Sequence, residues 1–209
     1  VSAVLDPIKL TITNYPEGKR ETFQAVNNPQ DETSGTHGVL FSRNLWIERD
    51  DFKEEAPAKY FRLTPGGREV RLKNGYIIRC TGCVKDADGN VTEVLCEYDP
   101  DTLTGMEGAK RKVKSTIHWI AQEDAVPCEV RLYDYLFTDE MPATDGDKPI
   151  EELLNPNSLK VLHNAFIESY ARDVKPGTQL QFQRIGYFVA DKDSSPKKLV
   201  FNRTVTLKS

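Results

Sequence analysis

The stretch that decides the fold begins with Tyr76-Ile-Ile-Arg-Cys-Thr-Gly-Cys-Val84 and continues through Lys-Asp-Ala-Asp-Gly-Asn to Val91-Thr-Glu-Val-Leu-Cys-Glu-Tyr98. Two strand-like segments flank Asp88-Gly89-Asn90, residue types that tolerate positive φ in tight turns. The pattern predicts a β-hairpin around Val84 to Val91, and it sets the expectation for the rest of the chain.

Further strand-like alternations lie on both sides of this hairpin, whereas regular helical periodicity is scarce. They cover Ile8–Ile12, Leu45–Ile47, Glu69–Leu72, Thr116–Ile120, Glu129–Tyr133, Thr178–Gln183 and Leu199–Leu207. Short strands separated by turn residues are typical of barrels and sandwiches. The sequence therefore predicts an all-β fold, and 209 residues suffice for one large domain or two small ones.

Three segments leave alternatives open. Asp50 to Glu55 fits a short helix capped by Asp50 or Asp51 and ended before Pro57. Ser158 to Ala171 fits both a helical stripe and a strand alternation. Thr178 to Tyr187 reads as one strand whose alternation breaks, either at a bulge near Arg184 or Gly186 or because the strand crosses between sheet faces.

The overall charge excludes a simple polycation. The chain carries 28 Lys and Arg against 32 Asp and Glu, a net charge of -4, so bulk positive charge cannot drive nucleic-acid binding. No apolar run approaches the roughly 18 to 20 residues that a spanning helix needs, and no leader opens the chain. We expect a cytoplasmic protein without membrane contact. The chain starts at Val1, which suggests a piece of a longer protein.

Catalytic and metal motifs are weak. His37, His118 and His163 have no nucleophile-elbow, zincin or phosphate-loop motif beside them. The CxxC of Cys80 and Cys83 has no second close pair, because Cys96 and Cys128 are far apart. We expect reduced structural thiols, no metal site and no catalytic residues in this chain.

Basic residues cluster although the total charge is negative. Lys59 to Lys73 holds five bases and one acid, interleaved with Tyr60 and Phe61, and Lys110-Arg-Lys-Val-Lys114 adds four bases. By contrast, residues 139–152 hold six acids and one base and read as a polar loop or linker. Arginine with aromatic residues suits single-stranded RNA, because guanidinium groups bind base edges or phosphates and rings stack on bases. An ordinary solvated face is the alternative.

Six motifs in one order carry a family resemblance: Val1-Ser-Ala-Val-Leu-Asp-Pro-Ile-Lys-Leu10, Leu45-Trp-Ile-Glu-Arg-Asp-Asp-Phe52, Glu69-Val-Arg-Leu-Lys-Asn-Gly-Tyr76, Lys112-Val-Lys-Ser-Thr-Ile-His-Trp119, Glu129-Val-Arg-Leu-Tyr-Asp134 and Phe201-Asn-Arg-Thr-Val205. Together they closely resemble the C-terminal anticodon-binding region of bacterial-type glutaminyl-tRNA synthetase, a class I aminoacyl-tRNA synthetase. The resemblance implies two small β-barrels of the ribosomal protein L25-like anticodon-binding type, with few short helices.

The same resemblance implies a domain plan and a parent enzyme. Residues 1–55 with 137–209 would form a proximal barrel, and residues 56–136 a distal one. A catalytic Rossmann domain would lie upstream of Val1 and use ATP and Mg to charge glutamine tRNA. This chain would contact that domain, carry no cofactor of its own, and act as a monomer.

Residue roles also follow from the resemblance. It places anticodon readers at Lys59, Phe61, Arg62, Arg71, Gln181 and Arg184. Arg62 would engage the third base G and Arg71 the first base, with Gln181 and Arg184 near the central U. Lys59 and Phe61 depart from the family pattern, so Phe61 could stack on a base. We expect Lys110, Arg111, Lys112 and Lys114 to contact backbone phosphates.

Two rival functions remain open. One is the anticodon-binding region of a eukaryotic or archaeal-type glutamyl-tRNA synthetase, and the other is a stand-alone L25-like protein that binds ribosomal RNA. A module that binds no RNA is a third reading.

Overall fold

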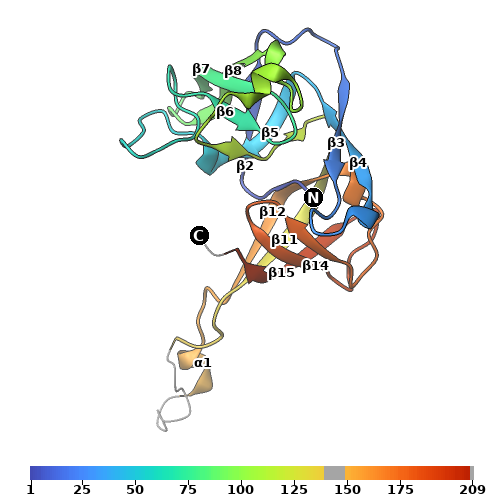
Figure 1. Cartoon of the computed structure of the whole chain (residues 1–209). Coiled ribbons are helices and arrows are strands. Elements are labelled where there is room, and N and C mark those ends of the chain that lie inside the picture. The colour runs from blue at the N-terminus through green and yellow to red at the C-terminus, as the bar shows by residue number, and fades with distance from the viewer. Residues whose placement is uncertain (139–148, 208–209) are drawn as a thin grey trace.

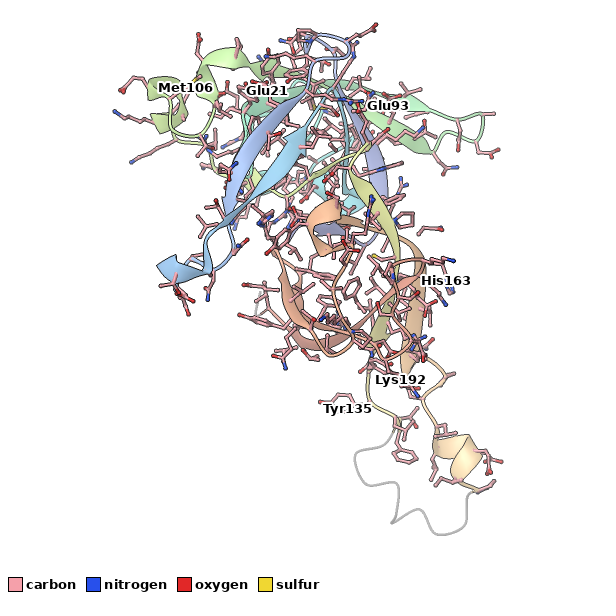
Figure 2. The ribbon with its side chains drawn as sticks, turned by 90° about the vertical axis from the view of Figure 1, so that its right-hand side faces the viewer. Glu21, Glu93, Met106, Tyr135, His163 and Lys192 are labelled. Atoms are coloured by element: carbon pink, nitrogen blue, oxygen red, sulfur yellow. The ribbon has the colours of Figure 1, made fainter. Side chains whose placement is uncertain are left out.

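The computed structural model of the chain describes residues 1–138 and 149–207. Two strongly curled, half-barrel sheets lie one above the other, and a long two-stranded arm extends from the second sheet to a short helix (Figure 1). Figure 2 places Met106 beside the first sheet and Tyr135 on the arm, far from each other. The predicted all-β class with two curled units is confirmed.

The first sheet contains the hairpin that the sequence predicts, with strand order β10-β5-β2-β8-β7-β6-β9. Its strands are β2 (Pro7–Ile12), β5 (Asn44–Glu48), β6 (Val70–Leu72), β7 (Ile77–Lys85), β8 (Val91–Asp99), β9 (Thr116–Ile117) and β10 (Ile120–Ala121). β7 and β8 pair antiparallel, and Gly89 in their connection has a φ of 84°. This is the left-handed region that glycine adopts without steric cost.

The second sheet has strand order β1-β12-β11-β15-β14-β13. Its strands are β1 (Ala3–Val4), β11 (Ala125–Tyr133), β12 (Leu159–Glu168), β13 (Gln179–Phe182), β14 (Gly186–Ala190) and β15 (Leu199–Thr206). β11 pairs with β15 in parallel and with β12 antiparallel. The outer parts of β11 and β12 form the arm that carries helix α1 (Ile150–Leu153).

A separate hairpin, β3 (Glu21–Val26) with β4 (Thr36–Phe41), links the two sheets. Phe23 and Phe41 stack at 5.0 Å between ring centroids inside the core of the first sheet. At the other end of the same hairpin, His37 stacks on Tyr170, which follows β12 of the second sheet, with 4.1 Å between the ring centroids. Trp46 of β5 also stacks on Phe166 of β12 at 5.0 Å. Aromatic contacts of this kind hold the two units in one arrangement.

Each sheet has its own apolar core. The first core includes the fully buried Leu10, Leu45 and Leu72, and the second includes Phe182 and Phe201. In β2 and β4 the buried residues alternate with exposed or half-buried ones, as expected when one face of a strand is solvated.

The structure corrects the helix expected at Asp50 to Glu55 and decides the segment that the sequence leaves open at Ser158 to Ala171. Asp50 to Glu55 does not form a helix: only Arg49–Asp51 makes a single 3-10 turn, η2. Ser158 to Ala171 resolves into strand β12 followed by another 3-10 turn, η6 (Ser169–Ala171). Other 3-10 turns are η1 (Glu32–Ser34), η3 (Pro100–Thr102) and η4 (Glu107–Lys110).

The strand expected over Thr178 to Tyr187 is wrong in its continuity. The chain turns after Phe182, and β13 pairs antiparallel with β14 through Phe182 and Gly186. Arg184 at the turn has a φ of 67°. The broken alternation therefore reflects a tight hairpin turn, neither a bulge inside one strand nor a crossing between faces.

The sheets group the strands differently from the expected division into 1–55 with 137–209 and 56–136. β2 and β5 hydrogen-bond within the same sheet as β7 and β8, whereas β11 belongs to the second sheet. Sheet membership is observed, and the division into two barrels at those boundaries stays a prediction.

The cysteines, the absence of a spanning helix and the acidic segment were also expected from the sequence. All four cysteines carry free thiols, and Cys80 and Cys96 face each other across β7 and β8. Among the helices of the described residues, none is long and apolar enough to cross a membrane. Most of the acidic segment 139–152, namely residues 139–148, lies outside the described residues.

Candidate nucleic-acid interface

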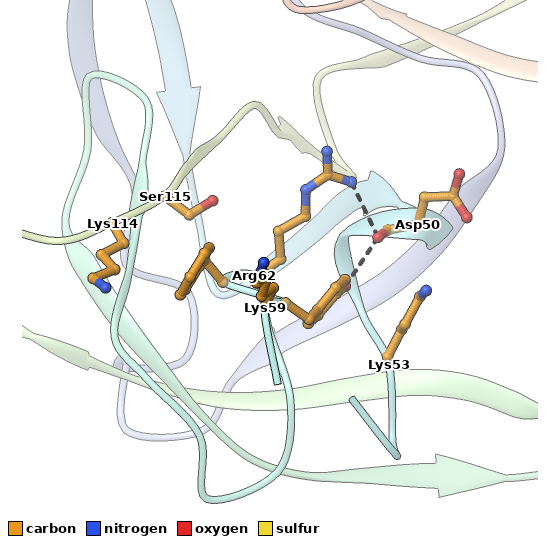
Figure 3. Close-up of a pocket in the computed structure, with 8 residues that line it drawn as sticks. Asp50, Lys53, Lys59, Arg62, Lys114 and Ser115 are labelled. Atoms are coloured by element: carbon orange, nitrogen blue, oxygen red, sulfur yellow. Dashed lines mark hydrogen bonds between the residues drawn. The ribbon is translucent and has the colours of Figure 1, made fainter. Parts of the chain in front are cut away.

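A basic and aromatic cavity of about 500 Å³ opens beside the turn η2 (Figure 3). Its lining consists of Asp50, Lys53, Lys59, Tyr60, Phe61, Arg62, Lys114 and Ser115. Three of the residues singled out in the first basic cluster, Lys59, Phe61 and Arg62, thus meet Lys114 of the second cluster in one site. We call this site the basic cavity.

Backbone bonds explain why the Tyr60–Leu63 segment lies against η2. The N–H of Leu63 donates to the carbonyl oxygen of Asp51 at 3.0 Å, and the N–H of Lys53 donates to the carbonyl oxygen of Leu63 at 3.0 Å. The Tyr60 hydroxyl and the Arg62 Nη1 both donate to the carbonyl oxygen of Asp50, at 2.9 Å and 3.2 Å (Figure 3). The segment that carries the basic residues is therefore fixed at its base.

Two cations lie near the aromatic ring of Phe61. Lys114 Nζ is 4.7 Å and the Arg68 guanidinium is 5.3 Å from the ring centroid. Cations over a ring face are attracted by its negative quadrupole. This ring is half-buried in the cavity wall, where an unstacked base could lie against it.

Arg71 lines a second cavity, of about 380 Å³, together with Thr104, Gly105, Met106, Ala109 and Lys110. Its Nη2 donates to the carbonyl oxygens of Ala109 at 2.6 Å and Arg111 at 3.3 Å. The structure therefore brings Arg71 to the Lys110–Arg111 segment and not into the basic cavity.

The cations expected to hold phosphates differ in their partners. Lys110 pairs with Glu107 at 2.6 Å, and Arg111 pairs with Asp99 at 2.8 Å and with Glu69 at 3.0 Å. The bond to Asp99 raises the pKa of Arg111, and the same bond lowers the pKa of Asp99. Lys112 is exposed and Lys114 lies over Phe61.

Gln181 and Arg184 come from the second sheet. Gln181 is exposed on β13, and its carbonyl oxygen accepts a bond from the amino group of Val1 at 2.9 Å. The side chain of Arg184 is 28% exposed and donates through both terminal nitrogens to Asp51, at 2.8 Å each. Burial by itself lowers the pKa of Arg184, but the bonds to Asp51 outweigh it and raise the pKa above the usual value.

Asp51 connects Arg62 of the basic cavity with Arg184 of the second sheet. Its side chain is fully buried, and besides Arg184 it lies 3.3 Å from Arg62 Nε. The sequence suggested Asp51 only as a helix cap. Lys53 and Ser115 of the cavity wall were also missed, because neither carries a pattern that separates it from an ordinary surface residue.

A resident metal finds no support in the geometry. Within residues 1–138 and 149–207, no three His, Cys, Asp or Glu side chains are grouped so as to hold a metal ion. The chemistry of the site is that of cationic and aromatic side chains, which suits an anionic ligand with planar bases.

Two family models match the chain, both described as the anti-codon binding domain of class I tRNA synthetases (E and Q). One covers residues 1–99 and the other residues 116–191. The basic cavity draws on the first matched range and, through Lys114 and Ser115, on the stretch between the two ranges.

Whole proteins with similar sequences are named glutamine--tRNA ligase. The relative from Bordetella avium is 55% identical over 208 residues, which is 99% of this chain and 35% of the relative. The relative from Rhodopirellula baltica is 52% identical over 207 residues, 99% of this chain and 34% of the relative. The relative from Clostridium perfringens is 49% identical over 208 residues, which is 99% of this chain and 37% of the relative.

This chain thus spans about a third of the length of these relatives. By its two matched models and these identities along its whole length, the chain belongs to the anticodon-binding domains of the class I tRNA synthetases for glutamate and glutamine.

Proposed function

We propose that this chain binds the anticodon loop of glutamine tRNA and reads its third base G and its central U, so that a glutamine--tRNA ligase charges the correct tRNA. The observation that carries the proposal is the basic cavity, where Lys59, Phe61, Arg62 and Lys114 converge. A cation fork beside a ring provides both a base-edge contact and a stacking surface.

Each reader has a proposed role. Arg62 donates to the edge of the third base, because its side chain is 41% exposed beside the cavity. Phe61 stacks on a base, and Lys59 and Lys114 attract the neighbouring phosphates. Arg71 contacts the first base from the second cavity, and Gln181 with Arg184 lies near the central U.

In this proposal the catalysis, with ATP and Mg, belongs to the remainder of the longer enzyme. This chain supplies recognition only: it binds the loop with its bases unstacked and positions the tRNA as a monomer in the cytoplasm. The family models cover the glutamate enzymes as well, so the third base is the point at which the two functions separate.

The test is a titration of the 209-residue chain with two anticodon hairpins that differ only in the third base, ending in UG or in UC. We expect tighter binding of the UG hairpin by about tenfold, since a bidentate arginine contact discriminates by roughly 1 to 3 kcal/mol. Preference for UC would favour a glutamate-type function, and equal affinity would contradict third-base reading.

The Arg62→Gln variant supplies the matched measurement. Its affinity for the UG hairpin should fall to that for the UC hairpin, because the charged fork is lost at one position. Arg172→Gln, an exposed arginine of the second unit outside the proposed site, should keep the preference. Loss of preference in both variants would place the discrimination elsewhere.

A further inference from the structure

Asp51 is a fully buried carboxylate in the short turn η2, at the place where the two sheets meet. A buried carboxylate is strongly disfavoured unless positive groups and hydrogen bonds compensate it. Here Oδ1 and Oδ2 each accept a bond from Arg184 at 2.8 Å, and Oδ1 also lies 3.3 Å from Arg62 Nε. One carboxylate is thus shared by two guanidinium groups.

The two arginines come from different sheets. Arg62 lies between η2 and β6 of the first sheet, whereas Arg184 is in the β13–β14 turn of the second. Arg184 also has a φ of 67°, a region that non-glycine residues rarely adopt. The bidentate bond to Asp51 offsets the strain of that backbone conformation and fixes where the turn lies.

The two guanidinium groups differ in which of their nitrogens are bonded within the protein. Both terminal nitrogens of Arg184 face Asp51, and its Nη1 also lies 3.2 Å from Nδ1 of His118. Arg62 uses Nε toward Asp51 and Nη1 toward the carbonyl oxygen of Asp50, and it borders the basic cavity. Arg62 is therefore the member of the pair that can offer N–H groups to a base edge, and one negative charge against two positive ones leaves the group cationic.

We propose that Asp51 is a positioning residue for base recognition: it holds Arg62 and Arg184 on one buried carboxylate, so that the second sheet determines how Arg62 is presented to the third base. This inference rests on the proposed function. It assigns Arg184 an indirect role through Asp51, in addition to its place near the central base.

The test compares hairpin preference in variants of the 209-residue chain. Asp51→Asn keeps the size of the side chain and removes its charge, so Arg62 loses its orienting partner. We expect the ratio of UC to UG dissociation constants to fall about tenfold, toward one. Arg184→Gln should lower the same ratio although Arg184 does not line the cavity, and the double variant should be no worse than Asp51→Asn alone.

Glu168→Gln provides the matched control. Glu168 is also a buried carboxylate near the place where the two sheets meet. It accepts the N–H of Ser2 at 2.8 Å and lies 3.4 Å from His37. This variant should lose stability while its hairpin ratio stays that of the unmodified chain. A merely structural role for Asp51 would make the two variants behave alike.

Three outcomes decide the proposal. If folded Asp51→Asn keeps the unmodified ratio while Arg62→Gln abolishes it, the positioning role is refuted. If Asp51→Asn does not fold, Arg184→Gln carries the test, because it removes the bidentate partner that fixes the Asp51 carboxylate, and an unchanged ratio there refutes the coupling. Equal binding of both hairpins by the unmodified chain would instead contradict the proposed function itself.

Discussion

Glu48, a half-buried acid, illustrates how a single carboxylate stabilises the region where the two sheets meet. Its Oε1 accepts the N–H of Leu5 at 2.7 Å, its Oε2 accepts the N–H of Asp6 at 3.1 Å, and His118 Nε2 lies 3.6 Å away. Burial alone raises the pKa of Glu48, but the nearby His118 side chain and the bonds from the two backbone N–H groups outweigh it, so the pKa is lowered overall. These bonds connect the end of β5 to the turn before β2.

Because the pKa of Glu48 is lower in the folded state, the stability of the protein decreases as the pH falls. The contribution of Glu48 is present above the unfolded pKa of about 4.3 and is lost as the pH falls through the lower folded pKa. We predict that Glu48→Gln lowers the free energy of unfolding by about 1 to 3 kcal/mol at pH 7 and flattens its decline below about pH 5. Urea unfolding at a series of pH values measures both effects.

Glu55→Gln is the control for this prediction, because Glu55 is exposed in the loop after η2. Its unfolding curve should stay within about 0.5 kcal/mol of the unmodified chain. A Glu48→Gln variant that keeps the full acid slope would show that other carboxylates carry it.

For single residues, the sequence predicts the cations of the site better than the acids that pair with them. Arg62 stands out in a local cluster, so spacing alone can single it out. Asp51 has no such signal, because its bidentate partner is 133 residues away in the chain. Long-range ion pairs of this kind follow from the tertiary fold and not from local pattern.

The β13–β14 hairpin is the element on which the second-sheet side of the site depends. Phe182 pairs with Gly186 beside the turn that carries Arg184, and Gly186 also pairs with Thr206 of β15. A Cβ placed at Gly186 would lie 2.5 Å from the carbonyl oxygen of Val205. Only glycine lets the backbones of β14 and β15 approach so closely.

We predict that Gly186→Ala destabilises the protein by about 1 to 3 kcal/mol, because β14 must move away from β15 to make room for the methyl group. Chemical denaturation measures the loss. Gly82→Ala in β7 is the matched control, since nothing lies within 4 Å of a Cβ at that position. That variant should change stability by less than about 1 kcal/mol, and equal losses in the two would argue against the steric explanation.

Strand prediction succeeded where alternation and turn chemistry agree, as in β7 and β8 around Gly89. It left β12 undecided, because the apolar residues of 159–170 satisfy two periods at once, and pairing with β11 and β1 decides in favour of a strand. The turn at Arg184 was missed because an arginine at positive φ gives no local signal, unlike glycine or asparagine. The fold class was therefore predictable from local patterns, whereas the joining of strands was not.

For the whole molecule, net charge describes RNA binding poorly. The total of -4 coexists with five bases and one acid between Lys59 and Lys73. Folding then neutralises part of the second cluster: Lys110 and Arg111 form ion pairs with acids of the same unit, while Lys112 is exposed. Charges that are already paired contribute less to the attraction of a phosphate than charges that face solvent alone.

The salt dependence of binding should therefore distinguish residues that share one cluster. Lys112→Ala should weaken all hairpins alike and reduce the slope of log affinity against log salt by about 0.7 to 0.9, the value for one phosphate contact. Arg111→Ala should reduce it by less than half as much, since a phosphate contact there requires breaking the bonds to Glu69 and Asp99. Hairpin titrations between about 50 and 200 mM salt measure both slopes. Equal reductions would mean that Arg111 exchanges its acidic partners for phosphate on binding. The number of phosphate contacts would then follow from the clustering of bases in the sequence, and not from the ion pairs of the free protein.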